Sequence, residues 1–198
     1  MFNLPEKALI KKQLPKAAVY RKFNLNNADK TRFDKDISRI DIVAELSPNT
    51  VSASKGSEVS SIFVLQISLK QMSFDEKNIA LISKLINQSM VFVLVCSEKA
   101  KLAVYHNKLF QTEWQNEKDL KINLIGANLD VVYQNIITQI GNIEITDNRS
   151  LDEQIEEDDR KEKLQKEIEK LERMAKKEVQ PKRKFELHQE ILRLKNEL

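Results

Sequence analysis

Residues 60–69 read SSIFVLQISL and residues 90–96 read MVFVLVC, and these two stretches decide the fold. The first alternates between a wholly apolar face and a second face that becomes polar at Gln66 and Ser68. That alternation predicts a strand, with one side of the sheet opening to solvent or a cleft near these two residues. The second stretch is apolar on both faces, which predicts a strand in the middle of the sheet.

A helix is expected between the two strands. Ser73 with Glu76 three residues later forms a capping-box pattern. The apolar stripe that follows consists of Ile79, Ile82, Leu85 and Ile86. Because a crossover through a helix joins strands that run in the same direction, we expect the two strands to lie parallel.

Further strands are expected on the C-terminal side of this unit. Residues 102–106 follow a charged turn and predict a hairpin with the central strand, and residues 108–114 and 119–124 predict more exposed strands. Asn128 then caps a helix. Its core-facing residues are expected to be Leu129, Val132, Tyr133, Ile136 and Ile140.

The N-terminal side is expected to be mostly helical. Pro5 and Pro15 mark the starts of short helical segments, and a helix capped near Asn27 carries an apolar face of Phe33, Ile37 and Ile40. A short strand is expected at residues 41–46. Residues 1–145 are therefore predicted to form one α/β domain, a mixed sheet flanked by helices.

Residues 146–198 predict a charged helical arm, either a hairpin or a coiled coil, with a break near Gln180-Pro181. Proline in a helix interior costs about 3 kcal/mol, so the arm is expected to fold back there. One apolar stripe runs along each half, and it must meet the other stripe, the body or a second chain. The stripes contain Leu164, Ile168, Leu171 and Ala175 in the first half, and Leu187, Ile191, Leu194 and Leu198 in the second.

Composition limits the class of protein. The chain is 41% hydrophobic and 32% charged, which is typical of a soluble protein with a real core. Its longest apolar run, Met90 to Cys96, falls well short of the roughly 20 residues that span a bilayer, and no signal-peptide core opens the sequence. Cys96 is the one cysteine, so an intrachain disulfide is excluded. We expect a cytoplasmic protein with no membrane contact.

The net charge of +3 is unevenly distributed along the chain. Basic residues gather near the N-terminus and again at the break in the arm, while residues 153–159 are mainly acidic. The basic cluster at the break predicts contact with a DNA backbone, because lysine and arginine neutralise phosphates whatever the base sequence. The alternative is that these cations merely solvate exposed helix surface. The candidates are Lys176, Lys177, Lys182, Arg183 and Lys184.

The sequence contains no recognisable catalytic or cofactor motif. The three glycines, Gly56, Gly126 and Gly141, stand far apart, so phosphate-binding glycine loops are excluded. His106 and His188 have no accompanying cysteines or regularly spaced carboxylates, and we expect no metal site and no cofactor.

One constellation resembles part of a nuclease site. Restriction-type nucleases place a carboxylate two residues before a lysine at the end of a strand, where it binds Mg²⁺. Here Lys70 ends the strand but Ser68 holds the carboxylate position, and the earlier acids are Glu45 and Glu58. We expect no catalytic residue here.

Trp114, the one tryptophan, lies in the less apolar strand region. Core packing is the ordinary role of such a residue, and the alternative is that it anchors a partner protein. The other candidate partner contacts are the stripe residues Leu164, Ile168, Leu171, Leu187, Ile191 and Leu194.

Several short segments resemble the bacterial domain-of-unknown-function family forty-three ninety-one over nearly the whole chain. They are Phe2-Asn3-Leu4-Pro5 with Lys12 and Pro15, Leu46-Ser47-Pro48-Asn49-Thr50, Leu69-Lys70, Thr112-Glu113-Trp114, Asn128-Leu129-Asp130-Val131-Val132-Tyr133, and the lysine–glutamate arm. The resemblance implies a genomic setting beside DNA methyltransferases and helicase-type restriction subunits. It implies no functional residues.

Three functions follow as hypotheses. The first is a non-catalytic accessory or adaptor protein of a restriction-modification or phage-defence module, with a DNA methyltransferase or helicase-type subunit as partner. The second is a divergent metal-dependent nuclease that uses Lys70. The third is a structural protein that forms a homodimer through the arm.

Overall fold

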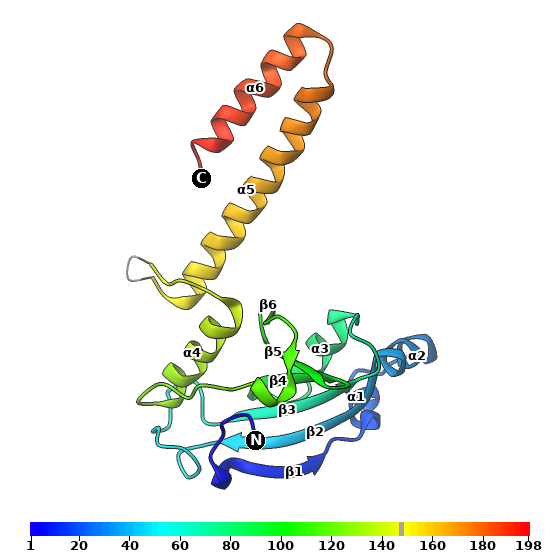
Figure 1. Cartoon of the computed structure of the whole chain (residues 1–198), viewed down its shortest axis with the longest axis vertical. Helices are drawn as coiled ribbons and strands as arrows, with labels where there is room; N and C mark the ends of the chain where they lie inside the picture. Colours follow the sequence, from blue (N-terminus) through cyan, green and yellow to red (C-terminus); the bar gives the residue numbers. More distant parts are fainter. Residues whose placement is uncertain (147–148) are drawn as a thin grey trace. The chain divides into compact units, whose positions relative to one another are not determined.

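The computed structural model describes residues 1–146 and 149–198 and divides the chain into two compact units, Met1–Ile143 and Glu144–Leu198. Residues 147 and 148, which fall within the predicted arm, lie outside the described part. The first unit is a mixed α/β domain and the second is a helical hairpin, as the sequence predicts (Figure 1).

One sheet organises the first unit. Over the described residues its seven strands run in the order β1-β2-β3-β4-β5-β6, with β7 paired to β5. The strands are β1 (Leu9–Gln13), β2 (Ile37–Leu46), β3 (Ile62–Leu69), β4 (Ser89–Cys96), β5 (Lys99–His106), β6 (Lys108–Gln111) and β7 (Gln115–Asn116).

The predicted strand–helix–strand unit is confirmed. β3 and β4 pair in parallel, with Leu65 beside Phe92, and β4 is buried along nearly its whole length. The helix between them is α3 (Glu76–Ser83). β5 returns antiparallel to β4, so the predicted hairpin is also present. The polar face of β3 does open to the surface, where Gln66 and Ile42 line a hollow of about 550 Å³.

The capping residue of α3 differs from the prediction. Asp75, and not Ser73, caps the helix by accepting from the backbone N–H of Lys77. The cause is the buried carboxylate of Asp36, which accepts from the N–H of Asp75 and from the amide of Asn78. These bonds fix the incoming chain so that the helix begins at Glu76, and it ends before Leu85 and Ile86.

The N-terminal prediction of mainly helix is wrong in two places. A 3₁₀ turn, η1 (Glu6–Ala8), leads into strand β1, which pairs with β2. Two helices follow, α1 (Lys16–Lys22) and α2 (Asn27–Asp36), the second capped by Asn26. Ile37 and Ile40 then lie in β2 and not on the helix, because their backbone pairs with β3 and both side chains are fully buried.

The helices α1 to α3 contribute to one apolar core. Val19, Phe33, Ile79 and Ile82 from these helices cluster with Leu65, Ile67 and Phe92 of the sheet. This burial is the main source of the domain's stability, at about 25 cal/mol per Å² of apolar surface.

A fourth helix, α4 (Leu129–Gly141), packs against β5 and β6. Its predicted cap is confirmed, because the Asn128 side chain accepts from the N–H of Val131 at 3.0 Å. The predicted strand at residues 119–124 is absent. A second 3₁₀ turn, η2 (Glu117–Asp119), and irregular chain occupy this region, so Leu120 and Ile122 are buried without pairing in the sheet.

The second unit contains α5 (Leu151–Lys177) and α6 (Pro181–Lys195). Ser150 and Glu153 form a capping box at the start of α5. The chain folds back between the helices at residues 178–180, so the predicted break at Gln180-Pro181 is confirmed (Figure 1). Among the described residues, no helix is both long and apolar enough to cross a membrane.

Candidate functional site

The two stripes of the hairpin pack against each other. Ile168, Ala175, Ile191 and Leu194 are buried in one cluster, with Leu164, Leu171 and Leu187 partly buried around it. The helices are antiparallel, since Lys195 near the chain end forms an ion pair with Glu172 at 2.7 Å and Arg160 donates to the backbone oxygen of Glu197. The six predicted partner contacts in the arm are therefore the residues that hold the hairpin closed.

The turn of the hairpin is organised by Glu178. Its carboxylate accepts from the backbone N–H groups of Gln180 and Val179, at 3.0 and 2.9 Å. These bonds, first that from Gln180, hold the pKa of the Glu178 carboxyl below its ordinary value. Pro181 occupies the first position of α6, where its missing N–H costs no helical hydrogen bond.

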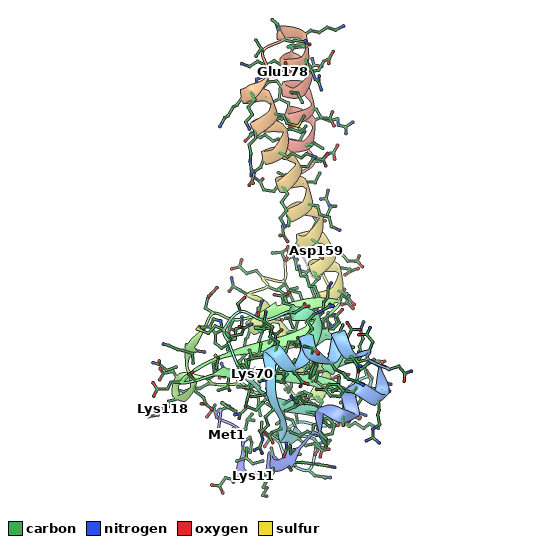
Figure 2. All side chains as sticks on the ribbon, turned by 90° about the vertical axis from the view of Figure 1, so that its right-hand side faces the viewer. Met1, Lys11, Lys70, Lys118, Asp159 and Glu178 are labelled. Atoms are coloured by element: carbon green, nitrogen blue, oxygen red, sulfur yellow. The ribbon has the colours of Figure 1, made fainter. Side chains whose placement is uncertain are left out.

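The fold-back gathers the five predicted cations at one end of the hairpin, which we call the tip (residues 176–185). Lys176 and Lys177 end α5, whereas Lys182, Arg183 and Lys184 lie in the first turn of α6. All five are exposed. Figure 2 shows Glu178 at this end of the hairpin, with side chains projecting outward around it.

The tip keeps an excess of positive charge. Glu178 is the one acid in residues 176–185, and it lies 3.5 Å from Arg183. No ion pair joins Lys177, Lys182 or Lys184 to any described residue. Such a surface can neutralise phosphate oxygens and release their counterions.

Two exposed apolar side chains at the tip are not among the site residues predicted from the sequence. Val179 is 89% exposed and Phe185 is 62% exposed. A signal was available, because Phe185 falls outside the spacing of Leu187, Ile191 and Leu194 and so cannot face α5.

Trp114 lies between β6 and β7 in the first unit, not within a strand as predicted. Its ring centroid is 4.9 Å from Nζ of Lys101, and the Phe74 ring is 5.2 Å from the same atom. Lys101 is only 8% exposed, and this burial lowers the pKa of its ammonium although Glu76 and Glu113 act in the opposite direction. The partly buried Trp114 ring thus packs on the core. Its role as a partner anchor stays a prediction.

The Lys70 end of β3 contains a different arrangement from a nuclease site. Lys70 donates to the backbone oxygen of Asp34, whose carboxylate accepts from Lys16 and Tyr20. Desolvation raises the pKa of Asp34, but these two hydrogen bonds outweigh it and the net pKa is lowered.

The acids considered for that site lie elsewhere. Glu45 is beside Phe63 in the register, at the opposite end of the β2–β3 pair from Lys70. Glu58 precedes β3 and lines a hollow at the start of that strand. In the described part of the chain, no group of three or more His, Cys, Asp or Glu side chains is placed to hold a metal ion.

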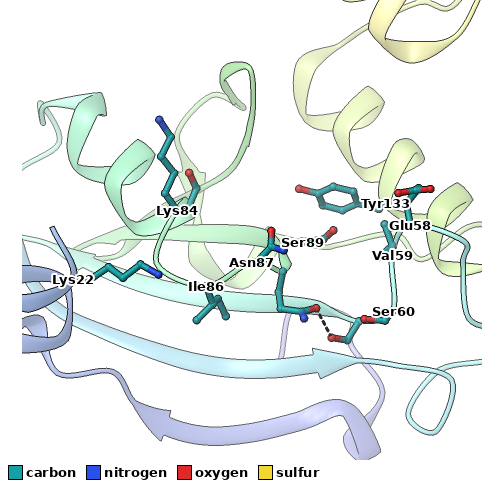
Figure 3. A pocket seen from close by; sticks show the side chains of 12 residues that line it. Lys22, Glu58, Val59, Ser60, Lys84, Ile86, Asn87, Ser89 and Tyr133 are labelled. Atoms are coloured by element: carbon teal, nitrogen blue, oxygen red, sulfur yellow. Dashed lines mark hydrogen bonds between the residues drawn. The ribbon is translucent and has the colours of Figure 1, made fainter.

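That hollow, of about 710 Å³, lies where β3 and β4 begin (Figure 3). Its lining is mainly polar and includes Lys22, Ser60, Asn87 and Ser89, with the Tyr133 ring at one side. Burial raises the pKa of the Tyr133 hydroxyl to about 12, so this group stays protonated at neutral pH. Histidine and cysteine are absent from the lining, and Glu58 is the one carboxylate among the residues that line it.

The two histidines are separated between the units. His106 ends β5, whereas His188 lies in α6. They belong to different compact units.

Comparison with known proteins identifies a family but no individual relative. Nothing among curated proteins or solved structures matches the chain. A family model does match, over residues 2–198, which covers both the α/β unit and the hairpin. The chain therefore belongs to the family described as Domain of unknown function (DUF4391).

Proposed function

We propose that this chain is a cytoplasmic, non-catalytic accessory protein of a restriction-modification or phage-defence module. In this role it binds a large partner protein, a DNA methyltransferase or a helicase-type subunit, and it contacts the nucleic-acid backbone through the hairpin tip. The choice of partner follows from the genomic setting that the family resemblance implies.

The proposed contact with nucleic acid rests on the gathering of five exposed cations at the tip. They come from two helix ends that are brought together only because the hairpin folds back. Elsewhere on α5 several cations are paired with acids one helical turn away, such as Lys166 with Glu162 and Arg173 with Glu169. The tip differs because Glu178 is its single acid. Unpaired cations suit phosphate, whereas paired ones only solvate a helix.

The packing of the two apolar stripes limits where a partner protein can bind. Ile168, Ile191 and Leu194 are already buried within the hairpin, so a homodimer formed through these stripes would first have to open it. A partner protein therefore meets the exposed surfaces of the hairpin or the α/β unit. Recovery of the native complex from cells, with identification of the co-purifying chain, tests whether it is a methyltransferase or a helicase-type subunit.

The test of the tip uses the full chain and a fluorescently labelled DNA. Changing Lys176, Lys177, Lys182, Arg183 and Lys184 to glutamine is expected to weaken binding and to flatten its dependence on salt, since each lost phosphate contact reduces the slope by about 0.9. The matched control changes five cations along α5 to glutamine: Lys161, Lys163, Lys166, Lys170 and Arg173. Equal loss in both variants would mean that net charge alone drives binding, which contradicts the proposal.

The nuclease alternative has a separate test. Plasmid cleavage with Mg²⁺ or Mn²⁺ compares the natural chain with Lys70→Ala. Because Lys70 hydrogen-bonds to the Asp34 backbone oxygen, we expect no metal-dependent cutting from either. Cutting that disappears in Lys70→Ala would replace the accessory role with an enzymatic one.

A further inference from the structure

The tip carries exposed apolar surface among its cations. Phe185 follows Lys182, Arg183 and Lys184 directly, and it is 62% exposed. Val179, in the turn, is 89% exposed. Single exposed apolar residues are ordinary on protein surfaces. An exposed aromatic ring within a cluster of exposed cations that holds a single acid is a more specific arrangement.

Phe185 cannot be explained by packing of the hairpin. At 3.6 residues per turn it lies about 160° around α6 from Leu187, which faces α5. Leu192, two turns further along the same outer face, is exposed to a similar extent, 63%. It lines a hollow with Glu172 and Lys195, together with the tip cations Lys176 and Lys184. The Phe185 ring is therefore free to meet a ligand that the cations attract.

The combination points to one class of nucleic acid. Proteins that bind single strands combine cations, which follow the phosphates, with aromatic rings on which bases stack. In a duplex the base faces are already stacked on one another, so an exposed ring adds little to a backbone contact. The cations alone would serve duplex and single strand alike.

We propose that the hairpin tip prefers single-stranded nucleic acid, with one base stacked on Phe185 and the adjacent phosphates contacted by Lys182 and Lys184. This preference rests on the proposed backbone contact and specifies its ligand. Stacking on a ring accepts any base, so the preference is for strand type and not for sequence.

The experiment measures fluorescence anisotropy of the full chain with a labelled oligothymidine and with a mixed-sequence duplex of equal length. Phe185→Leu is expected to weaken oligothymidine binding by about 5- to 150-fold, because stacking contributes about 1–3 kcal/mol per base. Duplex binding should stay unchanged, and Phe185→Trp should retain the preference. Leu192→Ala is the matched control, an equally exposed residue on the same face, and it should change neither affinity.

A second readout detects stacking directly. Trp114→Phe removes the one natural tryptophan, so Phe185→Trp in that background reports on the tip alone. Oligothymidine is expected to quench its fluorescence more strongly than the duplex does.

The outcomes separate this inference from the proposed function. The preference for single strands would be overturned if the natural chain bound both DNAs with equal affinity. It would also be overturned if Phe185→Leu weakened the binding of both DNAs equally, or changed the binding of neither. If the five glutamine substitutions still weakened binding in that case, the backbone contact would stand. If those substitutions also had no effect, both proposals would fall, and the apolar tip would instead be assigned to a protein surface.

Discussion

Nζ of Lys101 lies 4.9 Å from the ring centroid of Trp114, so the chain's one tryptophan covers a nearly buried ammonium group. Phe74 approaches the same ammonium at 5.2 Å. An ammonium removed from water loses hydration energy, and the electron-rich faces of the two rings offset part of that loss. The pair ties the loop after β6 to the middle of β5.

The Lys101–Trp114 contact should appear as a coupling energy. In a double-mutant cycle with Lys101→Met and Trp114→Leu, we expect about 0.5–2 kcal/mol of favourable coupling in urea unfolding, the range for a partly desolvated cation–π pair. Methionine keeps the length of the side chain without its charge. Strictly additive effects would show that the two residues only share a location.

Lys101 also predicts how stability changes at alkaline pH. Burial lowers its pKa from the ordinary 10.5, so the unfolded chain holds the proton more tightly than the folded chain. Stability therefore rises with pH between the lowered pKa and 10.5. Tyr20 and Tyr133 have raised pKa values and act in the opposite direction above pH 10. The tyrosine contributions are common to the natural chain and to Lys101→Met, so they cancel in the difference between the two unfolding free energies. As pH rises, that difference should change in favour of the natural chain.

Asp130 predicts a loss of stability in acid. Its carboxylate accepts from the N–H groups of Val59, Ser57 and Glu58 and from the Ser57 hydroxyl. These bonds, first that from Val59, lower its pKa below 3.8. The stabilisation is present above 3.8 and is lost as pH falls through the lowered value. Asp130→Asn should be less stable than the natural chain at neutral pH. The difference between the urea midpoints of the two proteins should narrow in acid. A constant gap would mean that ionisation of Asp130 has no role.

Gly56 should tolerate no side chain, because the loop passes directly over Asp130. A Cβ at residue 56 would lie 2.1 Å from Oδ1 of Asp130, which forces the two segments apart. Gly56→Ala is expected to cost about 1–3 kcal/mol of unfolding free energy. In the Asp130→Ala background the cost should nearly disappear, since the obstructing carboxylate is gone. If Gly56→Ala cost as much unfolding free energy in the Asp130→Ala background as in the natural chain, the strain would not come from the Asp130 side chain.

The packed interface between α5 and α6 should decide whether the hairpin resists proteolysis. Ile168 is fully buried between α5 and α6, and Ile168→Ala is expected to cost the hairpin about 2–4 kcal/mol. Because the hairpin is rich in lysine and arginine, limited trypsin digestion should cleave this variant faster within residues 151–195. Val179→Ala, an exposed change, is the control. Equal cleavage of both variants would contradict the observed packing.

Local signals in the sequence predicted much of the fold. Alternation in β3, uniform apolarity in β4 and the helix between them predicted a parallel pair, and Asn128 and Pro181 marked real helix starts. These predictions succeed because caps, proline and periodicity act within a few residues. For the candidate site, the cations at 176–184 were visible in the sequence.

Other features depended on contacts between distant residues. β1 exists because it pairs with β2, and Ile37 became part of a strand because β3 lies beside it. Asp36 moved the start of α3 by bonding to Asp75 across the fold.

The sequence by itself determined the mixed α/β body, the two charged helices and the place where they break, because each follows from local backbone preferences and from the spacing of apolar residues. Only the tertiary structure decided that the stripes of the hairpin bury each other, that the cations of two helix ends gather at the tip, and that Trp114 covers Lys101. The reason is physical: burial and the pairing of charges depend on which surfaces meet, and a linear pattern specifies a face without specifying what covers it.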